Sequence, residues 1–442
     1  MLKNISFFRR ITATLLALFM AMSFSSIAHA QIDGVSGTTF NLKAKSGHIT
    51  TPDGDSLLVW GYSLNDGPMQ YPGPTLILNQ GDTINITLDN TLNVPVSMVF
   101  PGQTSVQTTG GVNGLLTKEA AAVGSGNPTT VQYSFVANKP GTYMYHSGTN
   151  PEIQIEMGLL GAIIVRSAVA NQAYNHPDSR YDYEYLFILS EMDPAIHHKI
   201  ETGQPVDNNS YHPVLWFING RNAPDTMADA GVSWLPNQPY NSLPRVHPGD
   251  IALNRFVVAG RDLHPFHTHG NHYRLIARDG NLLESTPGSG ADLSHENYTL
   301  QTIPGSTYDT LWDWTGKELG WDIFGHTYTG LPANDPNPCV PDANGYNTIN
   351  GPSYREYCPN HNQEIPVTLP ELQDLAFGGF YSGSAFLGAA GGLPPGEGGL
   401  NLNGGMFYMW HSHNEREIVN NDIFPGGMMT MMIVEPPGVP IP

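Results

Sequence analysis

The HPFHTHG segment of residues 264–270 gathers three histidines within six residues. On a β-strand, side chains two residues apart point to the same face, so His267 and His269 would present two imidazoles to one side of a sheet. His264 stands at the start of the same segment. Imidazole is the commonest metal ligand in proteins, and three histidines this close together have little use in packing. We therefore expect a metal site at this segment.

A second segment, WHSH at residues 410–413, repeats the pattern with His411 and His413. Thioether side chains lie around it: Met406, Met409, Met428, Met429, Met431 and Met432. Soft thioethers beside imidazoles favour copper over other metals. Methionine also fills irregular gaps in a core, and we interpret most of these residues as packing residues.

An internal repeat adds His146 to the candidate ligands. Residues 142–148, TYMYHSG, resemble residues 407–413, FYMWHSH, with a histidine at the fifth place of each. Both copies continue into an apolar segment, at residues 158–165 and 427–434. Each copy is typical of a strand, a loop and a second strand that is buried on both faces.

A second matched element precedes each copy of the repeat. It is a Gly-Asp turn that leads into a strand, within residues 74–90 and again within residues 246–258. In the first of these, Ile84, Ile86 and Leu88 alternate with polar residues, as expected of a half-buried strand. A repeat of this size predicts two copies of one β-domain rather than a solenoid.

The composition supports an all-β protein with two domains. The chain has 48 Gly and 36 Pro, and only 13% of its residues are charged, with short β-rich segments between turns. These features favour β-sandwiches or barrels. We place the domains at residues 31–167 and 181–436, joined by a linker at 168–180. The second domain carries a loop-rich insertion at about 315–404.

The first thirty residues have the features of a secretory signal peptide. Lys3, Arg9 and Arg10 precede an apolar run at 11–27, and Ala28-His29-Ala30 forms a cleavage motif. The run is short for a membrane span, which needs about 20 apolar residues. We therefore expect a periplasmic or secreted protein with no membrane anchor after cleavage.

The charge excludes one class of partner. The predicted signal carries three of the 19 Lys and Arg residues and none of the 39 Asp and Glu residues, so the mature charge is 16 − 39 = −23. A chain this acidic repels phosphate backbones, and we expect no nucleic-acid partner.

Cys339 and Cys358 are the two cysteines of the chain. In an exported protein we expect a disulfide between them, which would stabilise the fold by roughly 3 kcal/mol through loop closure. The alternative is a metal–thiolate role, because His361 lies close to Cys358 in sequence.

The two histidine segments and the PGPT sequence at residues 72–75 resemble the multicopper oxidases, the laccase-like family built from cupredoxin domains. The resemblance covers both ends of the mature chain. It implies two cupredoxin-like Greek-key β-sandwich domains. In this family a blue copper bound by cysteine accepts electrons from the substrate. The electrons then pass to a three-copper cluster, held by four His-x-His pairs, that reduces oxygen to water.

Carried over residue by residue, the resemblance assigns His267, His269, His411 and His413 to the three-copper cluster. His146 matches a cluster ligand from the first domain, and His264 matches a ligand of the blue copper.

Several positions depart from the family pattern. Ser412 stands where the blue-copper cysteine is expected, and Glu417 stands where that site's second histidine is expected. Residues 99–102, VFPG, replace the first His-x-His-Gly, and Gly148 replaces the partner of His146. We therefore expect one or two copper ions rather than four, and no blue-copper site.

Three functions remain open. The first is a copper-dependent oxidoreductase with an incomplete metal set, acting on a small molecule or metal ion bound close to the copper. The second is a non-catalytic protein for periplasmic copper binding, storage or delivery. The third is a relic that has lost its metal. A nitrite reductase is disfavoured because the first domain has no cysteine, and a zinc hydrolase is disfavoured because no carboxylate has a general-base spacing. Two-domain members of the family often form trimers with ligands drawn from adjacent subunits, so a homotrimer is a reasonable expectation. The alternative is a monomer whose two domains face each other and form the same site within one chain.

Overall fold

The computed structural model describes residues 32–324, 328–351, 353–364, 406–435 and 439–441. The predicted signal peptide lies outside these residues, as does the part of the predicted insertion from residue 365 to 404. The described chain is built mostly from strands, which confirms the prediction of an all-β fold. Among the described residues, no helix combines the length and the apolar character that a membrane span requires.

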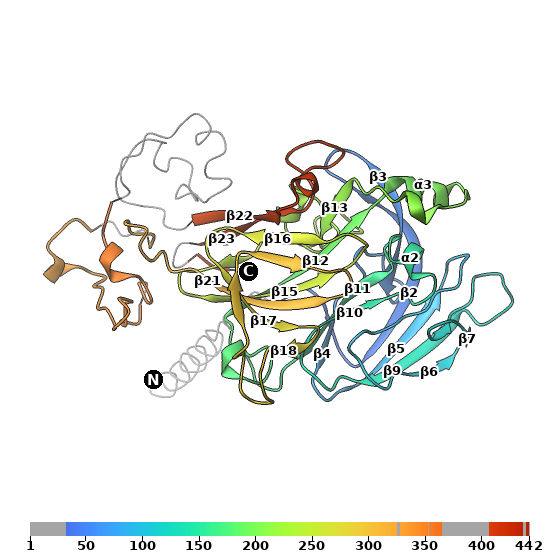
Figure 1. Ribbon diagram of the computed structural model, residues 1–442, viewed down its shortest axis with the longest axis horizontal. Helices are drawn as coiled ribbons and strands as arrows, with labels where there is room; N and C mark the ends of the chain where they lie inside the picture. The colour runs from blue at the N-terminus through green and yellow to red at the C-terminus, as the bar shows by residue number, and fades with distance from the viewer. Residues whose placement is uncertain (1–31, 325–327, 352, 365–405, 436–438, 442) are drawn as a thin grey trace, which may run out of the picture.

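Strands β1 to β11 form the first domain, and Figure 1 shows them in blue to green. One sheet has the order β1-β4-β11-β10, and the other has the order β3-β2-β5-β9-β6. The bounds are β1 Val35–Ser36, β2 Thr39–Thr50, β3 Ser56–Leu64, β4 Leu76–Asn79, β5 Thr83–Asn90, β6 Gln107–Gly110, β7 Val112–Asn113, β8 Lys118–Glu119, β9 Thr130–Val136, β10 Gly141–His146 and β11 Leu160–Arg166.

Strands β12 to β23 form the second domain. One sheet has the order β14-β23-β22-β16-β20, and the other has the order β13-β12-β15-β21-β17-β18, with β19 also paired to β17. The bounds are β12 Tyr183–Met192, β13 Leu215–Ile218, β14 Arg245–Val246, β15 Ile251–Val258, β16 His264–Thr268, β17 Tyr273–Arg278, β18 Asn281–Leu282, β19 His295–Asn297, β20 Thr299–Thr302, β21 Thr307–Asp313, β22 Met406–Ser412 and β23 Met429–Val434.

Short helices connect the strands. Their bounds are α2 Pro151–Gln154, α3 Pro194–Glu201, η1 Pro177–Ser179, η2 Asn208–Ser210, η3 Asp225–Met227, η4 Pro332–Asn334, η5 Cys358–Asn360 and η7 Glu415–Ile418. Helix α3 begins where Asp193 accepts a hydrogen bond from the amide of Ala195 (2.9 Å), with Pro194 at the first helical position.

Local sequence patterns account for the strands that matter most. In β5 the predicted alternation is present, because Ile84, Ile86 and Leu88 are buried between more exposed polar residues. The apolar segments that close each repeat form β11 and β23, and both strands are almost entirely buried. Each pairs antiparallel with the strand that carries the repeated histidine, β10 or β22. The internal repeat is therefore a repeat of structure.

A buried ion cluster joins the two domains. The guanidinium of Arg255 on β15 contacts the carboxylates of Glu184 (3.1 Å) and Asp309 (3.6 Å). It also donates to the hydroxyl of Thr142 on β10 of the first domain (3.0 Å). Tyr71 and Ser190 add a second buried hydrogen bond across the same boundary (2.7 Å). Charges buried this deeply are tolerated only when they are paired, so these contacts fix how the domains meet.

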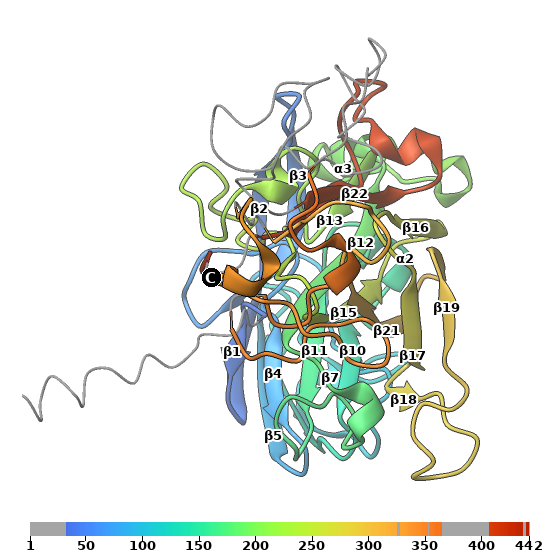
Figure 2. The ribbon, with the colours of Figure 1, turned by 90° about the vertical axis from the view of Figure 1, so that its left-hand side faces the viewer.

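The described part of the predicted insertion projects from one end of the second domain. Figure 1 shows residues 328–351 and 353–364 in orange beyond β21 and β23, and Figure 2 shows the same segment from that end. Within it, Cys339 and Cys358 form a disulfide, with Cα atoms 5.5 Å apart.

Candidate metal site

Two neighbouring strands of the second domain bring the histidine segments together. Strands β16 and β22 pair antiparallel, and His267 lies directly opposite His411. Directly opposite residues share one face of a sheet, so the two imidazoles point the same way. His269 follows the end of β16, where its amide donates to the carbonyl of Met409 (3.3 Å).

Four imidazoles converge at this point. Ring nitrogens of His267, His269 and His411 all lie within 4.8 Å of one another. The Nε2 atoms of His269 and His411 are 3.2 Å apart. The ring of His413 lies 4.8 Å from that of His267 and 5.6 Å from that of His411, measured between centroids. The structure therefore gathers four of the six candidate ligands.

Hydrogen bonds orient two of these rings toward the centre of the cluster. Nδ1 of His411 lies 2.6 Å from the carbonyl oxygen of Ser412. A carbonyl only accepts, so Nδ1 carries the proton and Nε2 keeps its lone pair for a metal. Nδ1 of His267 lies 2.7 Å from the hydroxyl of Thr299, which orients the ring and can either accept from that nitrogen or donate to it.

The cluster is in the protonation state that metal binding requires. Burial, together with the neighbouring imidazoles of His269 and His413, lowers the pKa of His267 to about 4. Burial and nearby imidazoles likewise lower the pKa of His411 to about 4. Burial and His413 also lower the pKa of His269. These three rings are neutral near pH 7, where neutral imidazole is the ligand form.

The cluster opens to solvent on one side. His411 is buried, whereas the side chain of His413 is 51% exposed. The exposed ring of Tyr298 stands edge-on to His267, with centroids 5.6 Å apart. A substrate or another protein surface can therefore reach the imidazoles.

A glycine shapes the turn behind the cluster. Gly270 has a φ of +95°, and a Cβ atom there would lie 2.8 Å from the ring of Tyr408. Only glycine adopts this conformation without strain, which explains the final residue of the HPFHTHG segment.

His264 lies apart from the cluster, in a separate buried pocket. Its Nε2 contacts the Glu191 carboxylate (3.0 Å) and its Nδ1 contacts the Glu417 carboxylate (2.9 Å). Burial alone would lower the pKa of His264, but its hydrogen bonds to the two carboxylates raise it to about 9. The ring is therefore an imidazolium at pH 7, with no lone pair to offer a metal. In the structure His264 therefore faces two carboxylates and lies outside the imidazole cluster, and its role as a copper ligand stays a prediction.

Two buried residues depart from the family pattern: Glu417, which contacts His264, and Ser412. Ser412 is fully buried, and its hydroxyl accepts a hydrogen bond from the amide of Asn414 (3.2 Å). Burial would raise the pKa of Glu191, but the hydrogen bond and charge of His264 hold it below its usual value. The pocket thus holds paired charges and offers no thiolate.

His146 lies at the end of β10 in the first domain, and its ring is not part of the cluster formed by His267, His269 and His411. Its local geometry repeats that of His411. Nδ1 of His146 lies 2.9 Å from the carbonyl of Ser147, just as His411 bonds to Ser412. This leaves the Nε2 lone pair of His146 available for a metal.

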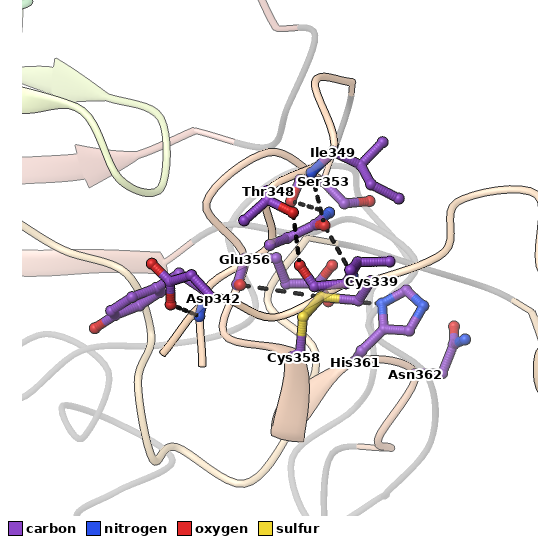
Figure 3. Close-up of a disulfide and its surroundings, with 12 residues drawn as sticks. Cys339, Asp342, Thr348, Ile349, Ser353, Glu356, Cys358, His361 and Asn362 are labelled. Carbon is purple, nitrogen blue, oxygen red and sulfur yellow. Dashed lines mark hydrogen bonds and ion pairs between the residues drawn. A yellow bond between two sulfur atoms is a disulfide. The ribbon is translucent and has the colours of Figure 1, made fainter. Parts of the chain in front are cut away.

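Another group of side chains with metal-binding potential surrounds the disulfide (Figure 3), and it consists of Cys339, Glu356 and His361. Its sulfur is already in the disulfide, so it supplies no thiolate. Nδ1 of His361 contacts Glu356 and Nε2 contacts Asp335, both at 2.8 Å. Both ring nitrogens of His361 are therefore paired with carboxylates, and neither is available to bind a metal.

Three residues of the two sites carry no recognisable signal in the sequence. Glu191 lies 73 positions from His264, within a buried strand. Thr299 and Tyr298 follow the histidine segment by about thirty residues and reach it through the pairing of β16 with β20. Only the pairing of strands brings them to the histidines.

Sequence comparison matches the first domain to a known family. Residues 43–169 match the sequence model of the multicopper oxidases. L-ascorbate oxidase of Nicotiana tabacum is 29% identical over 178 residues, which are 39% of this chain and 28% of that protein. Copper resistance protein A homolog of Pseudomonas syringae pv. tomato is 26% identical over 226 residues, which are 50% of this chain and 34% of that protein. The chain aligns with about a third of these relatives, or less.

Solved structures resemble the whole fold. The multicopper oxidase mgLAC superposes with a TM-score of 0.54 and 18% identity, covering 91% of this chain and 87% of its own. The blue copper oxidase from Nitrosomonas europaea gives a TM-score of 0.51 and 17% identity, covering 89% and 85%. At this identity the likeness concerns the fold.

Paired cupredoxin-like domains and a cluster of imidazoles make this chain similar to the multicopper oxidases in fold and in donor chemistry. Over residues 43–169 the sequence itself matches the model of that family. It departs from the family's pattern at Ser412, which replaces the cysteine of the blue-copper site.

Proposed function

We propose that this chain is an exported, periplasmic or secreted copper-dependent oxidoreductase that works with an incomplete metal set. The observation that carries the proposal is the convergence of His267, His269, His411 and His413, three of them held neutral by burial. A spacing of 3.2 Å between two imidazole nitrogens suits two ligands of one metal ion. The donor set fits copper, and four imidazoles suffice for one or two ions.

The route of the electrons differs from that expected for a complete multicopper oxidase. Ser412 has no thiolate, and His264 is tied to Glu191 and Glu417. Without a blue copper, the electron donor must approach the imidazole cluster itself. The exposed side of the cluster, beside Tyr298 and His413, gives a small molecule or a metal ion that access. Copper bound there would supply the redox chemistry, while the chain orients the imidazoles and keeps them unprotonated.

A homotrimer would complete the site. His146 has the same serine-carbonyl hydrogen bond as His411, although it stands outside the cluster in this chain. In a ring of three copies, His146 of one subunit would face the open side of the next subunit's cluster. A fifth imidazole would then reach the metal.

A second candidate function is copper storage or delivery without turnover. It is favoured by the methionines of β22 and β23 and by the likeness to copper resistance proteins from Pseudomonas syringae pv. tomato and Escherichia coli. Thioethers are soft ligands that select Cu(I), so a protein of this kind would hold the metal and pass it on.

Oxygen consumption separates the two functions. The copper-loaded protein should consume oxygen with a phenol, a diamine or a reduced metal ion as donor, and the paired change His267→Ala with His411→Ala should abolish this. The matched control is His272→Ala, which changes an exposed histidine near Tyr298 but outside the cluster. Tight copper binding with no oxygen uptake from any donor would reject the oxidoreductase and favour storage.

A further inference from the structure

One face of the β22–β23 pair is lined by methionine side chains. Met409 lies directly opposite Met431, and His411 lies directly opposite Met429. Residues two apart on a strand share a face, so Met409, Met429 and Met431 all point to the same side. Directly opposite residues have Cβ atoms about 5 Å apart, which brings the three thioethers within reach of one another.

Met409, Met429 and Met431 belong to a small buried cluster that is separate from the main core of the second domain, and methionine is the commonest residue only in the small cluster. Three of its four buried members are Met409, Met429 and Met431, the fourth being Ala223. On the opposite face of the same strands, Tyr408, Trp410 and Met432 join a core of 25 buried residues, of which three are methionines. Methionine fills irregular gaps in any core, but here three thioethers are concentrated in a cluster of four buried residues, beside an imidazole ligand candidate.

A fourth methionine packs against this cluster. Helix η3 lies over β23, because the Thr226 hydroxyl donates to the Met429 carbonyl (2.7 Å). Met227, the next residue, is partly buried and packs against the cluster. It adds a fourth thioether next to the three buried ones.

We propose that Met409, Met429 and Met431 form a thioether site for a soft monovalent ion, Cu(I), with Met227 packed against it. Thioethers are neutral, polarizable donors that select Cu(I) over harder ions. The site lies beside the imidazole cluster, because Met429 and His411 are direct neighbours across the two strands. It goes beyond the proposed oxidase function, since it requires binding of Cu(I) and no turnover.

The two faces of the same strands provide a matched pair of variants. The test variant replaces Met409, Met429 and Met431 with Leu, and the control replaces Met406, Met428 and Met432 with Leu. Both triples exchange buried methionines for a residue of similar volume, which cores tolerate well. The full chain is titrated anaerobically with Cu(I) against a chromophoric chelator, and with Ag(I) as a probe that does not change oxidation state. X-ray absorption of the loaded protein reports whether sulfur surrounds the metal.

The wild type and the control should bind one Cu(I) with sulfur scatterers, and the test variant should lose that equivalent or bind it at least tenfold more weakly. The paired change His267→Ala with His411→Ala should keep the sulfur-bound ion, which separates this site from the imidazole cluster. The proposal is overturned if wild-type protein shows no sulfur around Cu(I) or Ag(I), a result that needs no variant to fold. It is equally overturned if both triples lose the ion to the same degree.

Discussion

Glu417→Gln removes one of the two carboxylates that hold the buried imidazolium of His264. The shift in the pKa of His264 from 6.5 to about 9 corresponds to about 3 kcal/mol of net stabilisation, which is the gain from its two partners less the cost of burial. The folded pKa lies above the unfolded value. This stabilisation is therefore fully present below about pH 6.5 and is lost as the pH rises through about 9.

Because Glu191 still pairs with His264 in the variant, we expect Glu417→Gln to lower the free energy of unfolding by roughly 2 kcal/mol at pH 6. The difference from wild type should shrink as the pH rises toward 9, where wild-type His264 also loses its proton. Urea unfolding at pH 6, 7.5 and 9 measures this difference. Other groups that titrate in this range, such as His247, are present in both proteins and cancel in the comparison.

Glu415→Gln is the matched control, because the side chain of Glu415 is 71% exposed and contacts only the half-exposed His413 in the part of the chain described. It should change stability by less than about 0.5 kcal/mol. A loss from Glu417→Gln that stays constant between pH 6 and 9 would refute the ion-pair account of His264. An equal loss from Glu415→Gln would refute it as well.

Copper affinity should stay level from pH 8 down to about pH 5.5 and then fall steeply. The reason is that the pKa values of His267 and His411 are about 4, and protons compete with the metal at these two rings only near those values. Equilibrium dialysis against a copper buffer measures the affinity, and a decline beginning near pH 7 would contradict the prediction. Gly270→Ala should lower the free energy of unfolding by about 1–2 kcal/mol and weaken copper binding, because the alanine must adopt a φ of +95° against the ring of Tyr408. Thermal unfolding measures the first effect and copper content measures the second. Unchanged values would show that the turn relaxes without strain. His146→Ala should lower the copper content of a trimer and leave that of a monomer unchanged. Sedimentation combined with metal analysis measures both. Loss of copper from the monomer would place His146 at the cluster within one chain.

The sequence is sufficient to predict the fold class and the core of the site, since both depend on local spacing. Alternation of Ile84, Ile86 and Leu88 defines a half-buried strand, and two His-x-His pairs define faces that carry imidazoles. The resemblance to the multicopper oxidases also identifies the position of Ser412, which needs no structure to recognise.

The parts that the sequence does not reveal depend on pairing over long distances. His264 is three residues from His267 and shares its motif, yet its environment is set by Glu191 and Glu417, which lie 73 and 153 positions away. A sequence motif specifies the position of a side chain along the chain, but not which charged residues surround that side chain in the folded protein. The same limit applies to the methionines. The sequence does not distinguish those on one face of the sheet from those on the other, because that assignment depends on the register of β22 and β23.

The central claim is that copper is held by the imidazole cluster and not by a thiolate site. The most direct test measures the copper content per chain, together with optical and paramagnetic spectra, after export in the presence of copper. The account predicts one or two copper ions, no intense copper–thiolate absorption, and loss of the metal when His267 and His411 are both changed to Ala. A protein that holds no copper, or one that shows the intense band of a blue-copper site, would contradict it.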